Sequence, residues 1–394
     1  MIEREITPVL ENLFKKNPVV TVTGPRQSGK TTVCRAAFPD LAYFNLERPD
    51  QREFAIEDPR GFLRGCEGRA IIDEIQRAPD LVSYIQATVD ETQRTGQFVL
   101  TGSRQFRVAE AVSQSLAGRT AVLRLLPFSI REVQTARSGQ AVDDFIFSGF
   151  YPRIYDQDLD PSLALGDYFE TYVERDVRQI SEIRNLSSFQ KFVRLCAGRV
   201  GQLLNLHSLG NDAGVSHTTA RQWISVLEAS YIVFLLEPFH ASISKRLIKS
   251  PKLYFFDVGL ASHLLGIESV DQIATHPLRG FLFENMIVVE ALKHRFNHGR
   301  RANLSFYRDS GGTEVDLFYG LAEKVVSIEI KSGETVSSSF FANLRKVRDY
   351  LPDRVAGEIL VHGSESEAQR NGVWVTGAAG FVPRLASLER EFMG

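Results

Sequence analysis

The segment GPRQSGKT carries residues whose types and spacing suit phosphate binding. Gly24, Gly29, Lys30 and Thr31 fit the pattern G-x-x-x-x-G-K-[ST]. Glycines let backbone N–H groups curl around an anion, and a helix that starts at the loop adds its positive end. A chance glycine turn is the alternative, but the apolar strand before and the helical segment after favour a P-loop. The predicted ATP-binding residues are Gly24, Pro25, Arg26, Gln27, Ser28, Gly29, Lys30, Thr31, Thr32 and Ser103.

Asp73 and Glu74 follow the short apolar segment 70–72 and could supply the rest of this chemistry. Lys30 is expected to reach the β- and γ-phosphates, while Thr31 and Asp73 bind Mg²⁺. Glu74 could orient and deprotonate the attacking water. An acidic pair after a strand is often a turn, but its position downstream of a P-loop favours hydrolysis. Ser103 ends another apolar segment, where a sensor of the γ-phosphate would lie.

A second group of residues near the carboxyl end could handle a phosphodiester. In VVSIEIKSG, Glu329 and Lys331 lie two apart, so they share one face of a buried-looking strand. Such a pair costs desolvation energy unless it serves pairing or chemistry. Asp316 and Glu329 are hard oxygen ligands suited to Mg²⁺, and Glu284 is a further acid on an apolar helix. Lys331 would orient the nucleophile or neutralise developing charge.

Two alternatives stay open for this second group. Glu314 shares a strand face with Asp316, so the ligand set is ambiguous, and Glu329 and Lys331 could be a leftover ion pair. His294 and His298 lie four apart on a helix end, but without a third ligand we expect solvated side chains rather than a zinc site.

The amino-acid composition limits the class of protein that can contain these two groups of residues. The 394 residues predict two or three domains, and 43% hydrophobic with 24% charged residues are typical of a soluble globular protein. The net charge of −2 excludes a generally basic nucleic-acid binder but not a local basic patch. Three scattered cysteines suit a reducing cytoplasm, and no apolar run reaches the length of a membrane span. We therefore expect a cytoplasmic protein without membrane contact.

The elements around the P-loop predict an α/β fold with a parallel sheet. Apolar, β-branched segments recur along the first 135 residues, each followed by polar residues or a helical pattern. The expected strands lie within 18–23, 41–47, 70–72, 96–103 and 119–129.

This part resembles the AAA-type P-loop ATPases of bacteria and archaea. The resemblance rests on GPRQSGKTT, IIDEIQ, LTGS and the LAGR…L.PFS pattern, and it covers about residues 1–135. It implies that Arg119 acts on the γ-phosphate, in cis or from a neighbouring subunit. The alternative is that Arg119 caps a helix, since arginine is useful wherever a carboxylate lies within reach.

Residues 136–187 are expected to form a helical connector or lid on the ATPase core. Phe169, Tyr172, Val173 and Val177 follow a helical period. Residues 174–176 (Glu, Arg, Asp) could couple domains, but a solvated helix face is the preferred interpretation.

Residues 188–258 predict a winged helix. One helix begins near Leu209, Gly214 makes the turn, and Ser216 can cap the next helix, in which Ala220 and Trp223 point inward. A hairpin wing would follow, with Lys249 and Lys252 near its tip. Winged helices also serve as protein-interaction modules, so the motif is compatible with binding either DNA or protein. The predicted DNA-binding residues are Thr219, Arg221, Gln222, Lys245 and Arg246.

Residues 259–394 resemble the PD-(D/E)xK, restriction-endonuclease-like core. A buried helix with Glu284, a hairpin around Gly311 with Asp316, and the strand with Glu329 and Lys331 carry the resemblance. The chain departs from the pattern in having EVD in place of PD. The match is closer to the domain often fused to such ATPases, and with it the resemblance spans nearly the whole chain.

Together these features lead to two hypotheses. The first is an ATP-hydrolysing, Mg²⁺-dependent enzyme that binds DNA and cleaves it, with branched DNA as one candidate. The second is a regulatory ATPase switch whose nuclease-like domain is a non-catalytic platform for DNA or protein. AAA-type architecture suggests homo-oligomers, and the sequence names no protein partner.

Overall fold

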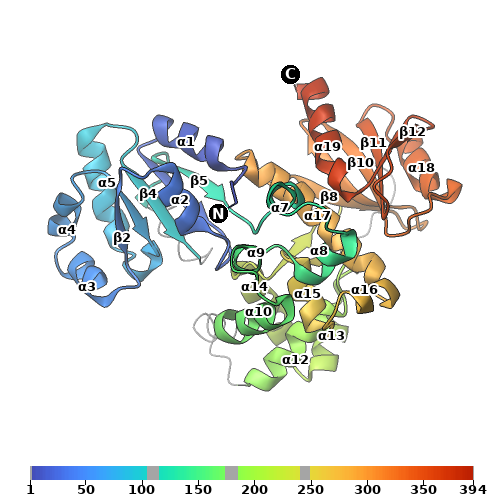
Figure 1. Cartoon of the computed structure of the whole chain (residues 1–394), viewed down its shortest axis with the longest axis horizontal. Helices are drawn as coiled ribbons and strands as arrows, with labels where there is room; N and C mark the ends of the chain where they lie inside the picture. The colour runs from blue at the N-terminus through green and yellow to red at the C-terminus, as the bar shows by residue number, and fades with distance from the viewer. Residues whose placement is uncertain (1, 104–114, 174–184, 240–248, 394) are drawn as a thin grey trace.

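The chain folds into three connected parts in the computed structural model, which describes residues 2–103, 115–173, 185–239 and 249–393. Figure 1 shows an α/β part near the N-terminus, a helical middle part, and a second α/β part near the C-terminus. The long helix α17 (Arg279–Asn297) lies where the parts meet.

The N-terminal part contains a five-stranded parallel sheet in the order β2-β3-β4-β1-β5. Four of the five strands fall within the segments predicted from the sequence, and β3 extends its predicted segment by one residue, so the α/β fold with a parallel sheet is confirmed here. The strands are β1 (Val19–Thr23), β2 (Ala42–Asn45), β3 (Ala70–Asp73), β4 (Phe98–Gly102) and β5 (Thr120–Arg124).

Helices cover both faces of this sheet. Successive strand side chains point to opposite faces, so Val19 and its neighbour Val20 enter two different hydrophobic clusters. The cluster around Val20 includes Leu10 and Phe14 of the first helix. The helical elements are α1 (Thr7–Lys16), α2 (Lys30–Ala37), α3 (Pro49–Glu57), α4 (Pro59–Gly65), η1 (Ile75–Arg77) and α5 (Leu81–Thr92).

The middle part begins with short helices, as the aromatic-rich pattern predicted. Phe169 is buried at the start of a π-helical turn, Phe169–Val173. Val177 and the candidate coupling residues 174–176 lie outside the described residues. The helices are α7 (Ile130–Ala136), α8 (Val142–Ser148), α9 (Pro152–Asp156), α10 (Pro161–Tyr168), α15 (Val258–Leu264) and α16 (Asp271–Thr275).

A helix–turn–helix and a strand pair lie between these helices in the sequence. Gly214 turns the chain with a left-handed φ of 74°, and the Ser216 hydroxyl accepts a hydrogen bond from the Thr219 N–H at 3.1 Å. Ala220 and Trp223 are buried as predicted. The elements are α12 (Leu186–Ala197), α13 (Leu206–Ala213), α14 (His217–Ala229) and the antiparallel pair β6 (Val233–Leu236) and β7 (Lys252–Phe255).

The C-terminal part is built on a six-stranded mixed sheet in the order β12-β13-β11-β10-β9-β8. The strands β8, β9 and β10 form an antiparallel meander, and β10 pairs in parallel with β11. The elements are β8 (Leu304–Arg308), β9 (Glu314–Leu321), β10 (Lys324–Lys331), η3 (Ser338–Phe341), α18 (Ala342–Tyr350), β11 (Val355–His362), β12 (Ala368–Arg370), β13 (Val373–Thr376) and α19 (Ala378–Met393).

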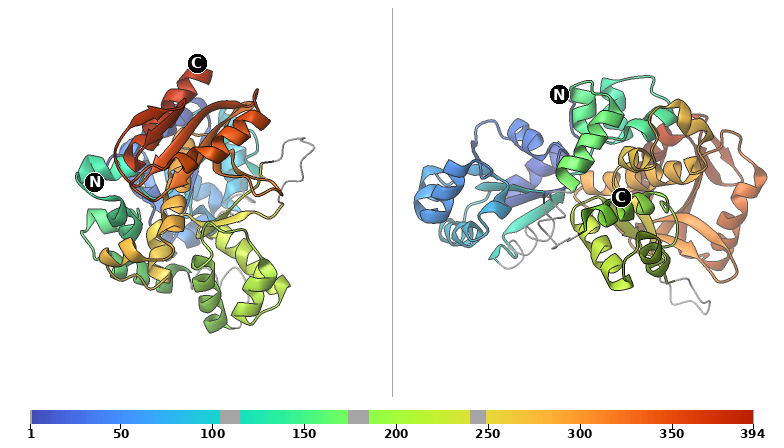
Figure 2. Two further views of the ribbon diagram at one scale, coloured as in Figure 1. Left: turned by 90° about the vertical axis from the view of Figure 1, so that its right-hand side faces the viewer. Right: turned by 90° about the horizontal axis from the view of Figure 1, so that it is seen from below.

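The middle and C-terminal parts share one hydrophobic core, whereas the N-terminal sheet has its own clusters. The shared core runs from Phe128 to Leu388 and includes Phe283, Ile287 and Ala291 of α17. Figure 2 shows from two further directions how closely these two parts pack. Helix α17 is buried over nearly its whole length, as its apolar sequence predicted.

No helix among the described residues has the length and apolar character to cross a membrane. Cys34, Cys66 and Cys196 are buried and free of disulfides.

Candidate functional site

The predicted P-loop connects β1 to α2 at the carboxyl edge of the parallel sheet. Gly24 is required by close packing, because a Cβ there would lie 2.0 Å from the carbonyl oxygen of Leu125. Lys30 begins α2, and its Nζ donates to the carbonyl oxygens of Gly24 at 3.1 Å and Pro25 at 2.6 Å. Burial lowers the pKa of Lys30. The structure thus places the Lys30 ammonium inside the loop, where phosphates would bind.

Asp73 lies at the tip of β3 and gathers three hydroxyl groups. Its Oδ2 accepts hydrogen bonds from Thr31 and Tyr43, both at 2.8 Å, and its Oδ1 accepts one from Thr101. The predicted magnesium pair, Thr31 and Asp73, is therefore in direct contact. Tyr43, on the neighbouring strand β2, was not predicted from the sequence, since only the β2–β3 pairing brings it to Asp73.

Glu74 follows with a left-handed backbone, at φ 58°. This conformation turns its side chain toward the end of β4, where Oε2 accepts hydrogen bonds from Ser103 at 3.3 Å and from Gln76. Burial raises the pKa of Glu74, and the positive charge of Lys30 opposes that shift. The predicted water-activating acid and γ-phosphate sensor therefore lie together. Gln76 was not predicted from the sequence.

The other P-loop residues frame this site. Arg26 lies 3.8 Å from the Glu47 carboxylate, and Gln27 has a left-handed φ of 58°. The Ser28 hydroxyl is buried, with no hydrogen-bond partner among the described residues. Thr32 lines a cavity of about 280 Å³ that α2 shares with the N-terminal segment and α9.

Arg119 lies at the opposite end of the sheet. Its carbonyl accepts a hydrogen bond from Val19 N at the start of β1, and its guanidinium pairs with Asp90. The five residues of β1 separate it from the P-loop by about 16 Å. Action of Arg119 in cis is therefore excluded by this geometry, and action on a neighbouring subunit stays a prediction.

The acidic residues predicted near the carboxyl end come together on β9 and β10. The register pairs Ile328 with Leu317, so the next position brings Glu329 opposite Asp316. Lys331 Nζ lies 2.8 Å from Glu329 Oε1 and 3.2 Å from Asp316 Oδ2. Both carboxylates therefore share one ammonium group, which explains why an ion pair is tolerated in this apolar strand.

Glu284 on α17 is held by residues that the sequence did not suggest. Its Oε1 accepts hydrogen bonds from Lys252 Nζ at 3.0 Å and from the Tyr254 hydroxyl. Lys252, which was predicted near the tip of a hairpin wing, lies at the start of β7 and is only 3% exposed, so it is not available to contact DNA. Glu314 pairs with Lys252 at 2.7 Å and with Arg308 at 3.1 Å, so its carboxylate is already neutralised.

Burial shapes the electrostatics of this acidic group. Desolvation, together with the charge of Asp316, raises the pKa of Glu284 to about 7 and that of Glu329 to about 8. The buried Glu329 Oε2 has no hydrogen-bond partner among the described residues. An additional cation at Asp316 and Glu329 would lower these raised pKa values and would give Glu329 Oε2 a partner.

The donor set fits a divalent ion held mainly by water or phosphate. Within the described ranges, no group of three or more His, Cys, Asp or Glu side chains is close enough to form a metal cage. Asp316 and Glu329 offer two hard carboxylates, as Mg²⁺ sites commonly do, and Lys331 is 33% exposed and can move aside. The residues therefore fit an open Mg²⁺ site rather than a closed one.

His294 is buried rather than solvated, which corrects the sequence expectation, whereas His298 is exposed as expected. His294 Nε2 lies 3.1 Å from Glu389 Oε2 on α19. Tyr319 and Arg300 also contact the Glu389 carboxylate. These contacts attach α19 to α17 and leave no histidine pair for zinc.

We expect Glu389→Gln to lower the free energy of unfolding by about 1–3 kcal/mol at pH 7. Burial alone would raise the pKa of Glu389, but hydrogen bonds from His294 and Tyr319 outweigh it and lower the pKa to about 2. A depressed acid pKa stabilises the fold above the ordinary value near 4.5, and this stabilisation is lost as pH falls toward 2. Urea unfolding across this window should show the difference from the unmodified protein shrinking as pH falls. Glu391→Gln, on the exposed face of the same helix, is the control, and an equal loss in both variants would contradict the prediction.

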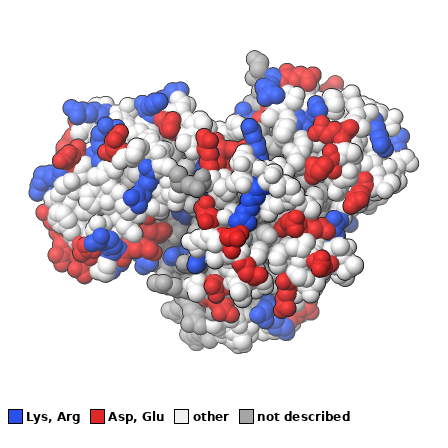
Figure 3. Space-filling model, viewed as in Figure 1, with Lys and Arg blue, Asp and Glu red and all other residues white. Residues whose placement is uncertain are grey.

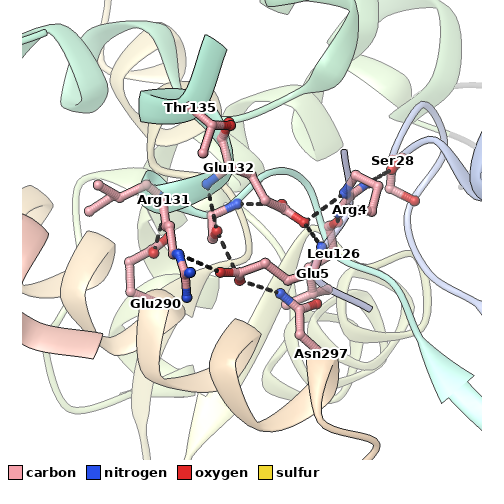
Figure 4. Close-up of polar contacts among 11 residues, drawn as sticks. Arg4, Glu5, Ser28, Leu126, Arg131, Glu132, Thr135, Glu290 and Asn297 are labelled. Atoms are coloured by element: carbon pink, nitrogen blue, oxygen red, sulfur yellow. Dashed lines mark hydrogen bonds and ion pairs between the residues drawn. The ribbon is translucent and has the colours of Figure 1, made fainter. Parts of the chain in front are cut away.

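A buried polar network ties the P-loop to the rest of the chain (Figure 4). Arg4 Nη1 donates to the carbonyl of Ser28 in the P-loop at 2.7 Å, and its Nη2 donates to the carbonyl of Leu126 at 2.8 Å. Arg4 Nε lies 3.0 Å from Glu132 Oε1 at the start of α7. One side chain therefore joins the nucleotide loop to the first helix of the middle part.

The network continues to α17. Glu5 N donates to Glu132 Oε1 at 2.7 Å, and Glu5 Oε2 accepts a hydrogen bond from Asn297 Nδ2 at 3.1 Å. Glu290 Oε2 accepts one from Ile130 N at 3.0 Å. The helix that carries Glu284 is thus connected to the P-loop by a short chain of hydrogen bonds.

Three of the five candidate DNA-contacting residues lie on α14. Arg221 and Gln222 are exposed near the helix N-terminus, and Thr219 is half-buried beside them. Lys245 and Arg246 lie outside the described residues. On the face shown in Figure 3, basic and acidic side chains are interspersed without a dominant sign.

Comparison with known proteins agrees with this division of the chain. An AAA domain matches residues 16–134, a domain of unknown function (DUF8612) matches 139–271, and a second (DUF4143) matches 279–380. With the parallel sheet and the P-loop geometry, the first match defines the N-terminal part as a P-loop ATPase domain of the AAA type.

The chain also has relatives that match most of its length. The uncharacterized proteins Rv2008c of Mycobacterium tuberculosis and Mb2031c of Mycobacterium bovis are each 31% identical over 354 residues, which cover 89% of this chain and 77% of the relative. The chain belongs to the family of these mycobacterial proteins.

Solved structures show weaker similarity. The Walker-type ATPase PABY2304 of Pyrococcus abyssi aligns with a TM-score of 0.43 and 13% identity, covering 67% of this chain and 96% of that one. AMPPCP-bound DnaA from Aquifex aeolicus aligns with a TM-score of 0.30 and 15% identity, covering 57% and 85%. Scores this low give no information on the function of this chain.

Proposed function

We propose that the protein is an ATP-hydrolysing, Mg²⁺-dependent enzyme that binds and cleaves DNA. The observation that carries the proposal is the presence of two separate groups of residues suited to phosphate chemistry. One is built on Lys30, Thr31 and Asp73, and the other on Asp316 and Glu329.

In the N-terminal group, each side chain has a place in hydrolysis. Lys30 would turn from the carbonyls of its own loop to the β- and γ-phosphates, while Thr31 and Asp73 would hold Mg²⁺. Glu74 would orient the attacking water and accept its proton, with Ser103 beside it facing the γ-phosphate. The raised pKa of Glu74 favours proton acceptance, because a base works best when its pKa approaches the working pH.

The nucleoside would enter the cavity beside α2. This cavity has a volume of about 280 Å³, lies next to Gly29 and Thr32, and is bounded by Val33 and Pro152. Ligand sites combine apolar walls with polar groups that fix orientation, and the lining here also includes the charged residues Glu3, Arg4, Glu11 and Asp156.

In the C-terminal group, Asp316 and Glu329 would hold a divalent ion at the end of the β9–β10 pair. Such an ion, when bound, would polarise a phosphodiester and lower the pKa of a water. Lys331 would then be released from the carboxylates to neutralise charge on the phosphate, and Glu284 would keep its place through Lys252.

DNA would dock on the helix–turn–helix. Arg221 and Gln222 are exposed at the start of α14, where such a helix presents side chains to a major groove. A winged-helix role for this part is supported by the strand pair β6 and β7 after α14. Lys245 and Arg246 would add phosphate contacts.

Homo-oligomers are part of the proposal. Arg119 is too far from its own P-loop, so its use on the γ-phosphate requires a second copy of the chain. Its partner Asp90 is exposed and would release it at an interface.

The test is a cleavage assay on linear, forked and four-way-junction DNA, with Mg²⁺ and with or without ATP. We expect at least one substrate to be cut in the presence of Mg²⁺ and none with chelator. Intact DNA under every condition would overturn the cleavage part of the proposal and leave the ATPase part standing.

A second candidate is a regulatory ATPase switch with a non-catalytic C-terminal platform. It is favoured by the contact of Lys331 with both Asp316 and Glu329, which offsets part of their negative charge without metal. The network from Ser28 to Asn297 would transmit the presence of a bound nucleotide from the P-loop to α17. A calorimetric titration that finds no divalent ion at Asp316 and Glu329 would favour this candidate.

A further inference from the structure

The acidic group near the carboxyl end contains a second lysine, and it comes from the middle part of the chain. Lys252 begins β7, in the region matched by DUF8612, whereas Glu284 and Glu314 lie in the region matched by DUF4143. Its Nζ lies 3.0 Å from Glu284 Oε1 and 2.7 Å from Glu314 Oε1. The four carboxylates thus form two halves, each with one ammonium group between two acids.

The two lysines differ in how firmly they are held. The Lys252 side chain is 4% exposed, whereas the Lys331 side chain is 33% exposed. Lys252 also lies on a strand paired with β6, and its Nζ is 5.5 Å from the centre of the Phe306 ring. Lys331 ends its strand and can turn to solvent, but Lys252 has no such route.

The lysine also fits its half of the group electrostatically. Burial alone would lower the pKa of Lys252, but the charges of Glu284, Asp316 and Glu314 outweigh it and raise the pKa. Tyr254, two residues further on the same strand face, donates its hydroxyl to Glu284. The half formed by Glu284 and Glu314 is therefore complete without any ion.

We propose that Lys252 is a fixed cation of the acidic site, occupying the place between Glu284 and Glu314 so that the site takes a single divalent ion, at Asp316 and Glu329. The inference rests on the proposed metal-dependent function. Lys252 is a positioning residue, because it acts through Glu284 and Glu314. Without its ammonium group, the buried Glu284 and the half-buried Glu314, which Arg308 also contacts at 3.1 Å, would face each other as a second pair of hard oxygen ligands.

The test counts Mn²⁺ ions bound to the full chain without nucleotide, by electron paramagnetic resonance of the free ion. All proteins carry Asp73→Asn, so that the N-terminal site does not contribute. We expect one Mn²⁺ per chain in this parent and two after Lys252→Met. Lys324→Met, at the exposed start of β10, is the matched control and should leave the number at one.

The outcomes separate the inference from the function on which it rests. A parent with one ion and a Lys252→Met variant with one ion would overturn the inference alone, as would a parent with two ions. A parent with none would remove the proposed metal site, and the inference with it. Adding Glu314→Gln to Lys252→Met should return the number to one, because the second pair of ligands is then broken.

A second measurement keeps the inference falsifiable if Lys252→Met does not fold. With Lys252 in place, we expect Glu329→Gln to weaken Mn²⁺ binding at least about tenfold and Glu314→Gln to leave it within about twofold. Equal weakening by both variants would place the ion in the half that Lys252 fills and overturn the inference. Thermal unfolding of each variant without Mn²⁺ checks that the fold is retained.

Discussion

Lys30→Ala will reduce steady-state ATP turnover at least about 10²-fold. The Lys30 ammonium group lies inside the P-loop, where it contacts the carbonyl oxygens of Gly24 and Pro25. Removing it takes away the positive charge that would stabilise the γ-phosphate as charge moves during transfer. Phosphate release under saturating Mg²⁺ and ATP measures the effect.

Two further variants sharpen this prediction. Glu74→Gln should keep nucleotide binding but stop hydrolysis, because the amide keeps the shape of the carboxylate and cannot accept a proton. Lys16→Ala, an exposed lysine on α1, should change nothing. Turnover that survives intact in Lys30→Ala would contradict the assignment of the P-loop as the catalytic nucleotide site.

Lys331→Ala will lower the rate of DNA cleavage by at least about 10²-fold, as will Asp316→Asn. Lys331 contacts both carboxylates, and its partly exposed side chain can reach a phosphate that approaches them. Asp316→Asn would also weaken the binding of the divalent ion, so raising the Mg²⁺ concentration should restore part of the activity of this variant. A single-turnover assay on the substrate that is cut best measures both rates.

The control for this prediction is Lys324→Ala, which changes a lysine on the same strand away from the acids. Its cleavage rate should match that of the unmodified protein. Cleavage that is unchanged in Lys331→Ala would remove the nuclease assignment and favour the regulatory switch.

The contact of the P-loop residue Thr31 with Asp73 could be predicted from the sequence because its geometry is local. The P-loop is one short segment, and its contacts with Asp73 follow from strands that were visible as apolar, β-branched runs. Glu329 and Asp316 were also predictable, since a hairpin and a two-residue spacing place them on one face.

What the sequence missed depends on long-range packing. Tyr43 reaches Asp73 only through the pairing of β2 with β3, and Lys252 reaches Glu284 only because β7 packs against α17. His294 looked like a helix-end residue, but α19 covers it from almost a hundred positions further on. Spacing rules cannot detect such contacts, because they describe neighbours within one element or one hairpin.

The length of α17 has a consequence for kinetics. Glu284 lies in the second turn of α17 and Asn297 is its last residue, so the acidic site and the P-loop network are separated by about 20 Å along one helix. No single phosphate can touch both, and a nucleotide bound at one cannot obstruct a backbone bound at the other. Any influence of ATP on the rate of DNA cleavage should therefore follow a noncompetitive rate law. In such a law the maximal velocity changes, and excess DNA does not restore it.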